Sequence, residues 1–221
     1  LQTSRRRLSI GENSLKKLPP EIGRLTLLKK LVVESNRLKV LPKEIGQLKS
    51  LTVLNLESNQ ISELPAEFGN LCDLVALSVG DNQIASLNSI GGALSRLQQL
   101  AVLNLENNQL TELSSHISDL KNLTALSVEG NQLNSLPLHF SRLQTLQVLV
   151  LDNNLYEHLP IEICSLSSLI ELRCAPSLSL SLSLSLSLSL SFSFALTKTG
   201  DIVWRGIGCL LFHPTLRDCP S

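Results

Sequence analysis

The sequence predicts an α/β solenoid, a stack of short repeats curved like a horseshoe, with a parallel β-sheet on its concave side and helical or irregular segments on its convex side. Two regularities support this prediction. One asparagine recurs with gaps of 23, 23, 23, 26, 23 and 23 residues, and one leucine recurs with the same gaps. Because a fixed period of this length is the signature of repeat architectures, we assign residues 1–176 to one array of about seven repeats.

The recurring asparagine is expected to hold the turn that follows each strand. Its amide both donates and accepts hydrogen bonds, so it can satisfy backbone groups that would otherwise be buried without partners. Because the spacing is regular, these side chains should lie in register and form a ladder along the array. The predicted ladder consists of Asn13, Asn36, Asn59, Asn82, Asn108, Asn131 and Asn154.

Each repeat resembles the pattern LPxEIGxLxxLxxLxLxxNxL. The alternation around the central leucine predicts a short strand whose leucines point inward and whose neighbours face solvent. The LPxEIG part predicts the return segment, since proline favours a turn or the first turn of a helix. We expect the core to be closed from the convex side by Ile22, Ile45, Phe68, Ile117, Phe140 and Ile163.

Two repeats depart from this pattern. The segment between Leu87 and Leu100 is three residues longer than its counterparts and has no proline. Three residues are about one helical turn, so we place the insertion on the convex face, where it should leave the sheet unbroken. In the N-terminal repeat, Arg5 occupies the position at which a repeat should have its first leucine. Because the sequence also lacks Met, we expect a fragment that a cap or further repeats precede.

The repeat pattern stops at residue 177, where Ser177 replaces the expected asparagine. Strict Ser-Leu alternation follows, as a CT dinucleotide tract read in one frame would encode. We therefore interpret residues 177–221 as a low-complexity and unrelated tail that is disordered or non-native. An array that ends without a polar cap would leave the apolar edge around Leu169 and Leu172 open to aggregation unless the tail covers it.

The cysteines favour a reducing compartment. They are odd in number and form no CxxC pair, so we expect reduced thiols that act as small buried hydrophobic side chains, and a cytoplasmic location. The single glycosylation sequon at Asn122 would instead suit a secreted protein, although one such triplet is expected by chance. No apolar run reaches the roughly 18 residues of a membrane span. The cysteines are Cys72, Cys164, Cys174, Cys209 and Cys219.

No catalytic constellation is evident. The histidines lie in different repeats or in the tail, without a paired carboxylate or cysteine at ligand spacing. The glycines at 206 and 208 lack both the third glycine and the βαβ context of a dinucleotide site. We therefore expect no enzyme activity and no catalytic, cofactor-binding or metal site. The histidines are His116, His139, His158 and His213.

The outward-facing strand residues form the predicted binding surface. They are small and mildly apolar, and beside them runs an acidic row that begins at Glu34. Such a floor with charged edges suits a protein partner held on the concave face. The predicted protein-binding residues are Lys30, Val32, Val53, Asn55, Glu57, Ala76, Ser78, Val102, Asn104, Glu106, Ala125, Ser127, Glu129, Val148, Val150 and Asp152.

Charge is segregated along a chain whose net charge is zero. Residues 1–49 contain 12 Lys/Arg and 4 Asp/Glu, whereas residues 50–176 contain 4 and 13. The basic end could bind nucleic acid, but it lacks interleaved aromatic residues and the acidic body would repel phosphate, so we do not expect nucleic acid binding. We expect a monomer whose charge distribution orients a charged protein partner.

Over residues 8–175 the repeats LPPEIGRLTLLKKL, LPKEIGQLKSLTVLNLESNQISE and LPAEFGNLCDL resemble the Ras-scaffold class of leucine-rich-repeat proteins, which includes plant intracellular relatives. The resemblance implies a scaffold or adaptor in cytosolic signalling, with a small GTPase or a phosphatase as partner. The proline-free repeats that begin at Leu87 and Leu113 depart from the family pattern. The alternative is a recognition module of a larger kinase, GTPase or ubiquitin ligase whose catalytic domain lies outside this sequence.

Overall fold

The computed structural model describes residues 6–174 in full and the backbone of residues 194–196 and 202–205. The expectations for Arg5, the Ser-Leu tract, Cys209, Cys219 and His213 concern positions outside the described residues.

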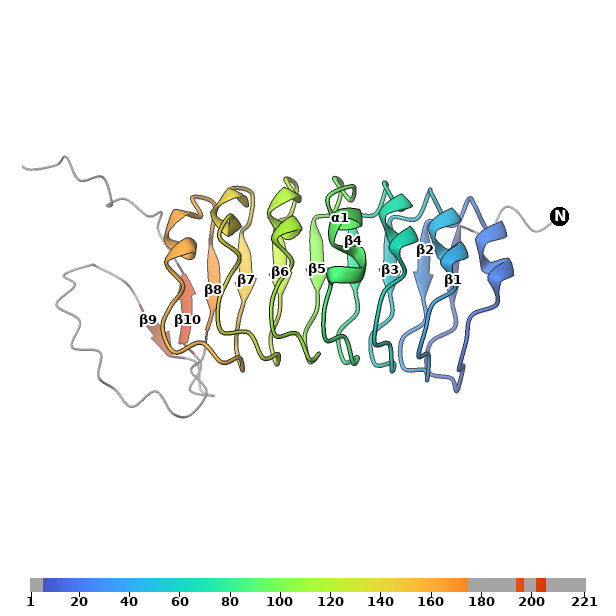
Figure 1. The fold of residues 1–221 in the computed structure, drawn as a ribbon, viewed down its shortest axis with the longest axis horizontal. Coiled ribbons are helices and arrows are strands. Elements are labelled where there is room, and N and C mark those ends of the chain that lie inside the picture. Colours follow the sequence, from blue (N-terminus) through green and yellow to red (C-terminus); the bar gives the residue numbers. More distant parts are fainter. Residues whose placement is uncertain (1–5, 175–193, 197–201, 206–221) are drawn as a thin grey trace, which may run out of the picture.

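Parallel strands of three residues form one open sheet, as predicted, and they follow one another in chain order (Figure 1). Equivalent residues of adjacent repeats pair, so that Leu54 lies beside Leu77 and Leu77 beside Leu103. The strands are β1 (Arg7–Ser9), β2 (Lys30–Val32), β3 (Val53–Asn55), β4 (Ala76–Ser78), β5 (Val102–Asn104), β6 (Ala125–Ser127), β7 (Val148–Val150) and β8 (Glu171–Arg173).

Two further strands continue the sheet beyond β8. Strand β10 (Ile202–Arg205) pairs antiparallel with β8, and β9 (Phe194–Leu196) pairs antiparallel with β10. The backbone of β10 therefore occupies the hydrogen-bonding edge that β8 would otherwise present. Leu169 and Leu172, at the end of the repeat array, are each 7% exposed.

The return segments are mostly short 3-10 helices, which stack along the convex side (Figure 1). Proline precedes four of them as N-cap residue, because its restricted φ suits the extended approach to a helical turn. These helices are η1 (Pro20–Arg24), η2 (Lys43–Gln47), η3 (Ala66–Asn70), η4 (Asn88–Ile90), η5 (Ser115–Asp119), η6 (Phe140–Arg142) and η7 (Ile161–Ser165).

The three-residue insertion forms α1 (Gly91–Leu94), a single α-helical turn directly after η4. It lies on the convex side, between η3 and η5 (Figure 1). Across the same repeat, Ala76 still pairs with Val102, so the insertion leaves the register of the sheet intact. Both features agree with the expectation from the sequence.

One continuous apolar core runs along the array between the sheet and the return segments. The central leucines of the strands enter it from one side, and Ile45, Phe68 and Phe140, all fully buried, enter it from the other. Complete burial of such a side chain contributes about 1.5–3 kcal/mol. Each repeat therefore gains its stability by covering its neighbour.

The asparagines bind the turns of adjacent repeats together. The Nδ2 group of Asn82 donates to the carbonyl oxygens of Val79 and Gly80 in its own repeat, at 3.0 and 2.9 Å, and to Leu56 O of the preceding repeat at 3.1 Å. Its Oδ1 accepts from the backbone N–H of Ile61 at 2.9 Å. The same four contacts recur at Asn36, Asn59, Asn108, Asn131 and Asn154.

The residue before each ladder asparagine has a left-handed backbone. Ser58 and Asp81, for example, have φ of 52° and 51°, and Gly130 at the equivalent position has φ of 65°. This conformation costs a non-glycine residue about 1–2 kcal/mol. The hydrogen bonds of the following asparagine offset that cost, which explains how side chains are tolerated at a position that favours glycine.

We expect Asn82→Asp to lower the free energy of unfolding by about 3 kcal/mol or more, because a carboxylate oxygen would replace the donor that faces three carbonyl oxygens. Urea unfolding followed by circular dichroism measures the loss. Asn13→Asp is the matched control, since Asn13 is exposed and its side chain contacts carbonyls of its own repeat alone. Equal losses in the two variants would contradict the importance of the ladder.

The glycine of the EIG pattern allows adjacent 3-10 helices to stack closely. A Cβ atom at Gly46 would collide with the backbone carbonyl oxygen of Glu67 in the next repeat. We therefore expect Gly46→Ala to destabilise the array by about 1–3 kcal/mol in thermal unfolding. A Cβ at Gly92 in α1 would meet nothing within 4 Å, so Gly92→Ala should leave the melting temperature unchanged or higher. A melting temperature unaffected by Gly46→Ala would refute this account of the stacking.

Candidate functional site: the concave face

The concave face consists of aligned columns of side chains, because each of the parallel strands β1 to β8 contributes the residues on either side of its central leucine. The first column contains Arg7, Lys30, Val53, Ala76, Val102, Ala125, Val148 and Glu171. The second column contains Ser9, Val32, Asn55, Ser78, Asn104, Ser127, Val150 and Arg173. The first column is thus basic at its start, apolar in the middle and acidic at its end.

A groove of about 680 Å³ lies over strands β1 to β5. Its floor is formed by first-column and second-column residues, including Val53, Ala76 and Val102. Arg7 and Lys30 line one end of the groove, and Glu34 and Glu57 line one side. The groove therefore combines an apolar floor with a basic end and an acidic margin.

The acidic row consists of Glu34, Glu57, Glu106, Glu129 and Asp152, with Gly80 at the equivalent position of the fourth repeat. Side chains of the second column donate to this row. Asn55 Nδ2 donates to Glu34 Oε2 at 2.5 Å, and Ser78 Oγ donates to Glu57 Oε1 at the same distance. These contacts hold the carboxylates close to the concave floor.

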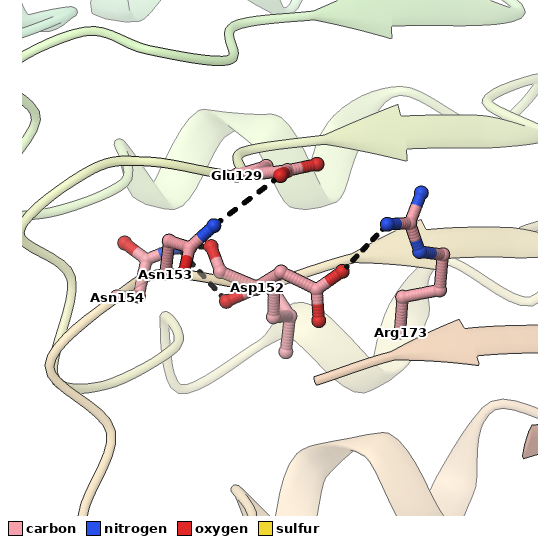
Figure 2. Close-up of polar contacts among 6 residues, drawn as sticks. Glu129, Asp152, Asn153, Asn154 and Arg173 are labelled. Atoms are coloured by element: carbon pink, nitrogen blue, oxygen red, sulfur yellow. Dashed lines mark hydrogen bonds and ion pairs between the residues drawn. The ribbon is translucent and has the colours of Figure 1, made fainter. Parts of the chain in front are cut away.

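Asp152, the last member of the row, has a cationic partner within the chain. Arg173 Nη2 lies 3.1 Å from Asp152 Oδ2, and Figure 2 shows this pair beside the contact of Asn153 with Glu129. The Asp152 side chain is only 4% exposed.

Most of the predicted binding residues lie together on this face, but three offer little surface. Val32 and Val150 are each 9% exposed and Asp152 is 3% exposed, whereas Val102 is 43% exposed. Asp152 is covered where Arg173 reaches over it. Conversely, Arg7 and Ser9 line the groove although the predicted set omits them. The 23-residue period that relates Arg7 to Lys30 was the signal that could have found them.

The cysteines differ from the expectation of buried apolar side chains. Cys72 and Cys164 are exposed and Cys174 is half-buried, so the expectation is wrong for the first two. Both lie on the outer side of the repeat, where the return segment faces solvent. The histidines of the repeats, His116, His139 and His158, are exposed.

Two titratable groups at the C-terminal end of the array are shielded from solvent, since Tyr156 is buried and Cys174 is half-buried. Burial, assisted by the nearby charge of Asp152, raises the pKa of the Cys174 thiol to about 11. Burial raises the pKa of the Tyr156 hydroxyl far above its usual value, and the nearby charges of Cys174 and Glu162 add smaller increases. No hydrogen-bond partner of the Tyr156 hydroxyl is found among the described residues. Both groups are held in their neutral forms at pH 7, which makes them structural side chains there.

No group of three or more His, Cys, Asp or Glu residues in the described part of the chain could hold a metal ion. Over the same residues, no helix has the length and apolarity that crossing a bilayer requires.

The raised pKa of Cys174 leads to a prediction about its reactivity. The thiolate is the nucleophile, so a higher pKa leaves less of it at pH 8, and we expect iodoacetamide to modify Cys174 at least about tenfold more slowly than the exposed Cys72. Peptide mass spectrometry after timed quenching measures both rates. In denaturant the two rates should converge. Equal rates in the folded protein would show that Cys174 is not shielded.

Known families and structures match the chain over its repeats. A family model described as leucine-rich repeat region matches residues 21–101, and one described as leucine rich repeat matches residues 85–133. No curated protein matches the chain. Proteins built from such solenoids typically use the concave surface for binding and are not themselves catalysts.

Solved structures share the fold. A leucine-rich-repeat protein of Leptospira interrogans is 34% identical with a TM-score of 0.65, covering 74% of this chain and 47% of that one. An internalin of Listeria monocytogenes is 26% identical with a TM-score of 0.69, covering 79% and 49%. The leucine-rich-repeat ectodomain of the Arabidopsis thaliana membrane receptor kinase GASSHO1/SCHENGEN3, in complex with CASPARIAN STRIP INTEGRITY FACTOR 2, is 34% identical with a TM-score of 0.66, covering 76% and 20%.

The chain therefore spans about half the length of the two bacterial proteins and about a fifth of the plant ectodomain. The family matches lie within the repeats whose strands form the open parallel sheet. These observations together identify the chain as a leucine-rich-repeat protein whose repeats form a solenoid.

Proposed function

We propose that the chain is a scaffold or adaptor of intracellular signalling that holds a protein partner on its concave face. The observation that carries the proposal is the groove over β1 to β5, whose floor of small apolar side chains lies between a basic end and an acidic margin. Apolar surface surrounded by polar residues is typical of protein interfaces. The acidic row would repel phosphate groups, which favours a protein over a nucleic acid as partner.

The finer assignment follows from the resemblance of the repeats to the Ras-scaffold class. It makes a small GTPase or a phosphatase the partner to test first and the cytoplasm the expected location. Cys72 and Cys174 support a reducing environment, since both are free thiols. We expect the array to act as a monomer.

A second candidate function is that of a recognition module within a larger enzyme. The plant relative favours it, because that structure is the ectodomain of a receptor kinase and was solved as a complex with another molecule. In that case the repeats would bind and a separate domain would catalyse. Sequencing the complete transcript distinguishes the two candidates, since an adaptor predicts further repeats or caps, and an enzyme predicts a catalytic domain in the same reading frame.

We expect the double substitution Val102→Arg and Val148→Arg to reduce recovery of the partner at least about tenfold in pull-down assays with the full chain, because two long cations would cover the small apolar floor. Val102 is 43% exposed, so the array can accommodate an arginine there without unfolding. Quantitative mass spectrometry of the recovered proteins, with candidate GTPases and phosphatases added in purified form, measures the change.

The matched control is the double substitution Leu27→Arg and Leu138→Arg. Leu27 and Leu138 are 52% and 79% exposed and belong to the return segments, so the control adds the same charge and removes the same kind of side chain away from the concave face. If the control reduced partner recovery as much as the concave variant, or if the concave variant had no effect, the proposed binding face would be wrong.

A further inference from the structure

Four exposed cations adjoin one another on β1 and β2, at the N-terminal end of the sheet (Figure 1). Arg7 in β1 and Lys30 in β2 are paired in register. The backbone N–H of Lys29 donates to Arg6 O at 2.8 Å, so these two residues also lie side by side. Adjacent strands are about 4.8 Å apart, and like charges at such a separation repel each other. The basic cluster consists of Arg6, Arg7, Lys29 and Lys30.

The described part of the chain supplies no counter-ion to the basic cluster. Within residues 6–174, none of its four cations forms an ion pair. Two carboxylates line the same groove, those of Glu34 and Glu57, but both are held by neutral donors. Glu34 Oε2 accepts from Asn55 Nδ2, and Glu57 Oε1 accepts from Ser78 Oγ. The four cations are therefore available to anionic groups of another molecule.

The basic cluster is continuous with the apolar floor of the groove. Arg7 and Lys30 line the groove together with Val53, Ala76 and Val102, which follow them in the first column. The rest of this column is uncharged until β8, so its positive charge is confined to the N-terminal end. Beyond β2 the acidic margin of the groove is not offset by a first-column cation, so an anionic group would be repelled there.

On these grounds we propose that the basic cluster binds the acidic end of an extended segment of the partner protein, whose adjoining apolar residues lie on Val53, Ala76 and Val102. This inference rests on the proposed function, because it gives the chemistry of the partner on the concave face. Carboxylates form strong charge-assisted hydrogen bonds with Lys and Arg, and an arginine can hold one carboxylate through two parallel bonds. The small apolar side chains of the floor leave room for the apolar part of the segment.

A nucleic acid fits this charge pattern less well than such a segment. Its phosphates recur along the whole strand, so those beyond the basic cluster would face the acidic margin of the groove. A protein segment can instead place its acidic residues at one end alone. The confinement of the cations to β1 and β2 therefore favours a protein whose charge is equally confined.

The spacing of the strands sets the length of the segment. Strands β1 to β5, over which the groove extends, span four intervals of about 4.8 Å, or about 19 Å. An extended chain advances about 3.3 Å per residue, so about six residues cover this distance. Acidic residues within the two or three positions at one end would lie over β1 and β2. Apolar residues at the remaining positions would lie over β3 to β5.

The test uses a display library of random 12-residue peptides selected on the full 221-residue chain. We expect the selected peptides to contain two or more Asp or Glu residues within three positions, with apolar residues on one side of them. Peptides synthesised from the selection should bind the chain in fluorescence anisotropy. Replacement of their Asp and Glu by Asn and Gln should weaken binding at least about tenfold.

The decisive variant is Arg7→Glu with Lys30→Glu, which reverses the charge of the cluster inside the groove. Both side chains are exposed, so the array can accept the substitutions. We expect this variant to select basic peptides in place of acidic ones, a change that a folding defect could not produce. The matched control is Lys16→Glu with Lys17→Glu, which makes the same change of charge at exposed positions outside the groove and should still select acidic peptides.

Several outcomes would overturn the inference. They are selected peptides without an acidic end, unchanged selection on the charge-reversed variant, an equal effect of the control, and a thymidine oligonucleotide that binds the groove more tightly than the acidic peptides. Neutral peptides that are lost on Val102→Arg with Val148→Arg, but kept on the charge-reversed variant, would exclude the acidic end and leave concave-face binding intact. A selection without binders, or peptides insensitive to both sets of substitutions, would count against both proposals.

Discussion

Coupling between neighbouring repeats is the constraint on which the whole molecule depends. A strand of three residues and a 3-10 helix of three to five residues cannot cover an apolar core by themselves. From Asn36 onward, the ladder asparagines stabilise the turn that connects the strand to the return segment, because each amide bonds carbonyl groups of two repeats at once. The left-handed residue before each asparagine is held by that amide and by backbone hydrogen bonds to the next repeat. Loss of one repeat's contacts therefore weakens both of its neighbours.

The same coupling creates the binding surface. Because the repeats stack in register, one residue type at one repeat position becomes a column of side chains on the concave face, and a single departure from the pattern becomes a local site. Gly80 is such a departure, since the Glu106 side chain packs over it, and Asn104 beside it donates to Glu57. The periodic part of the sequence thus forms the floor of the concave face, and residues that depart from the pattern make one part of that face chemically different from the next.

Identical residues at equivalent repeat positions do not always have the same environment. Leu136 and Leu159 precede the prolines of successive return segments, yet Leu136 is 7% exposed and Leu159 is 55% exposed. Val102 in the first column is exposed to solvent, whereas Val150 in the second column is buried near the pair of Asp152 and Arg173. Exposure depends on the neighbour in the next repeat, which may stand 21 or more residues away, so a residue's own position in the pattern does not determine it.

The sequence by itself determined the solenoid, the parallel sheet, the ladder positions and the placement of the three-residue insertion, because each of these follows from a spacing that stacking must respect. Tertiary structure decided which members of the concave face are accessible, which side chains hold the Glu57 carboxylate, and that Arg173 pairs with Asp152. It also decided the exposure of Cys72 and Cys164. These features depend on side-chain contacts between repeats, and periodicity specifies where a side chain begins but not where its charged or polar end lies.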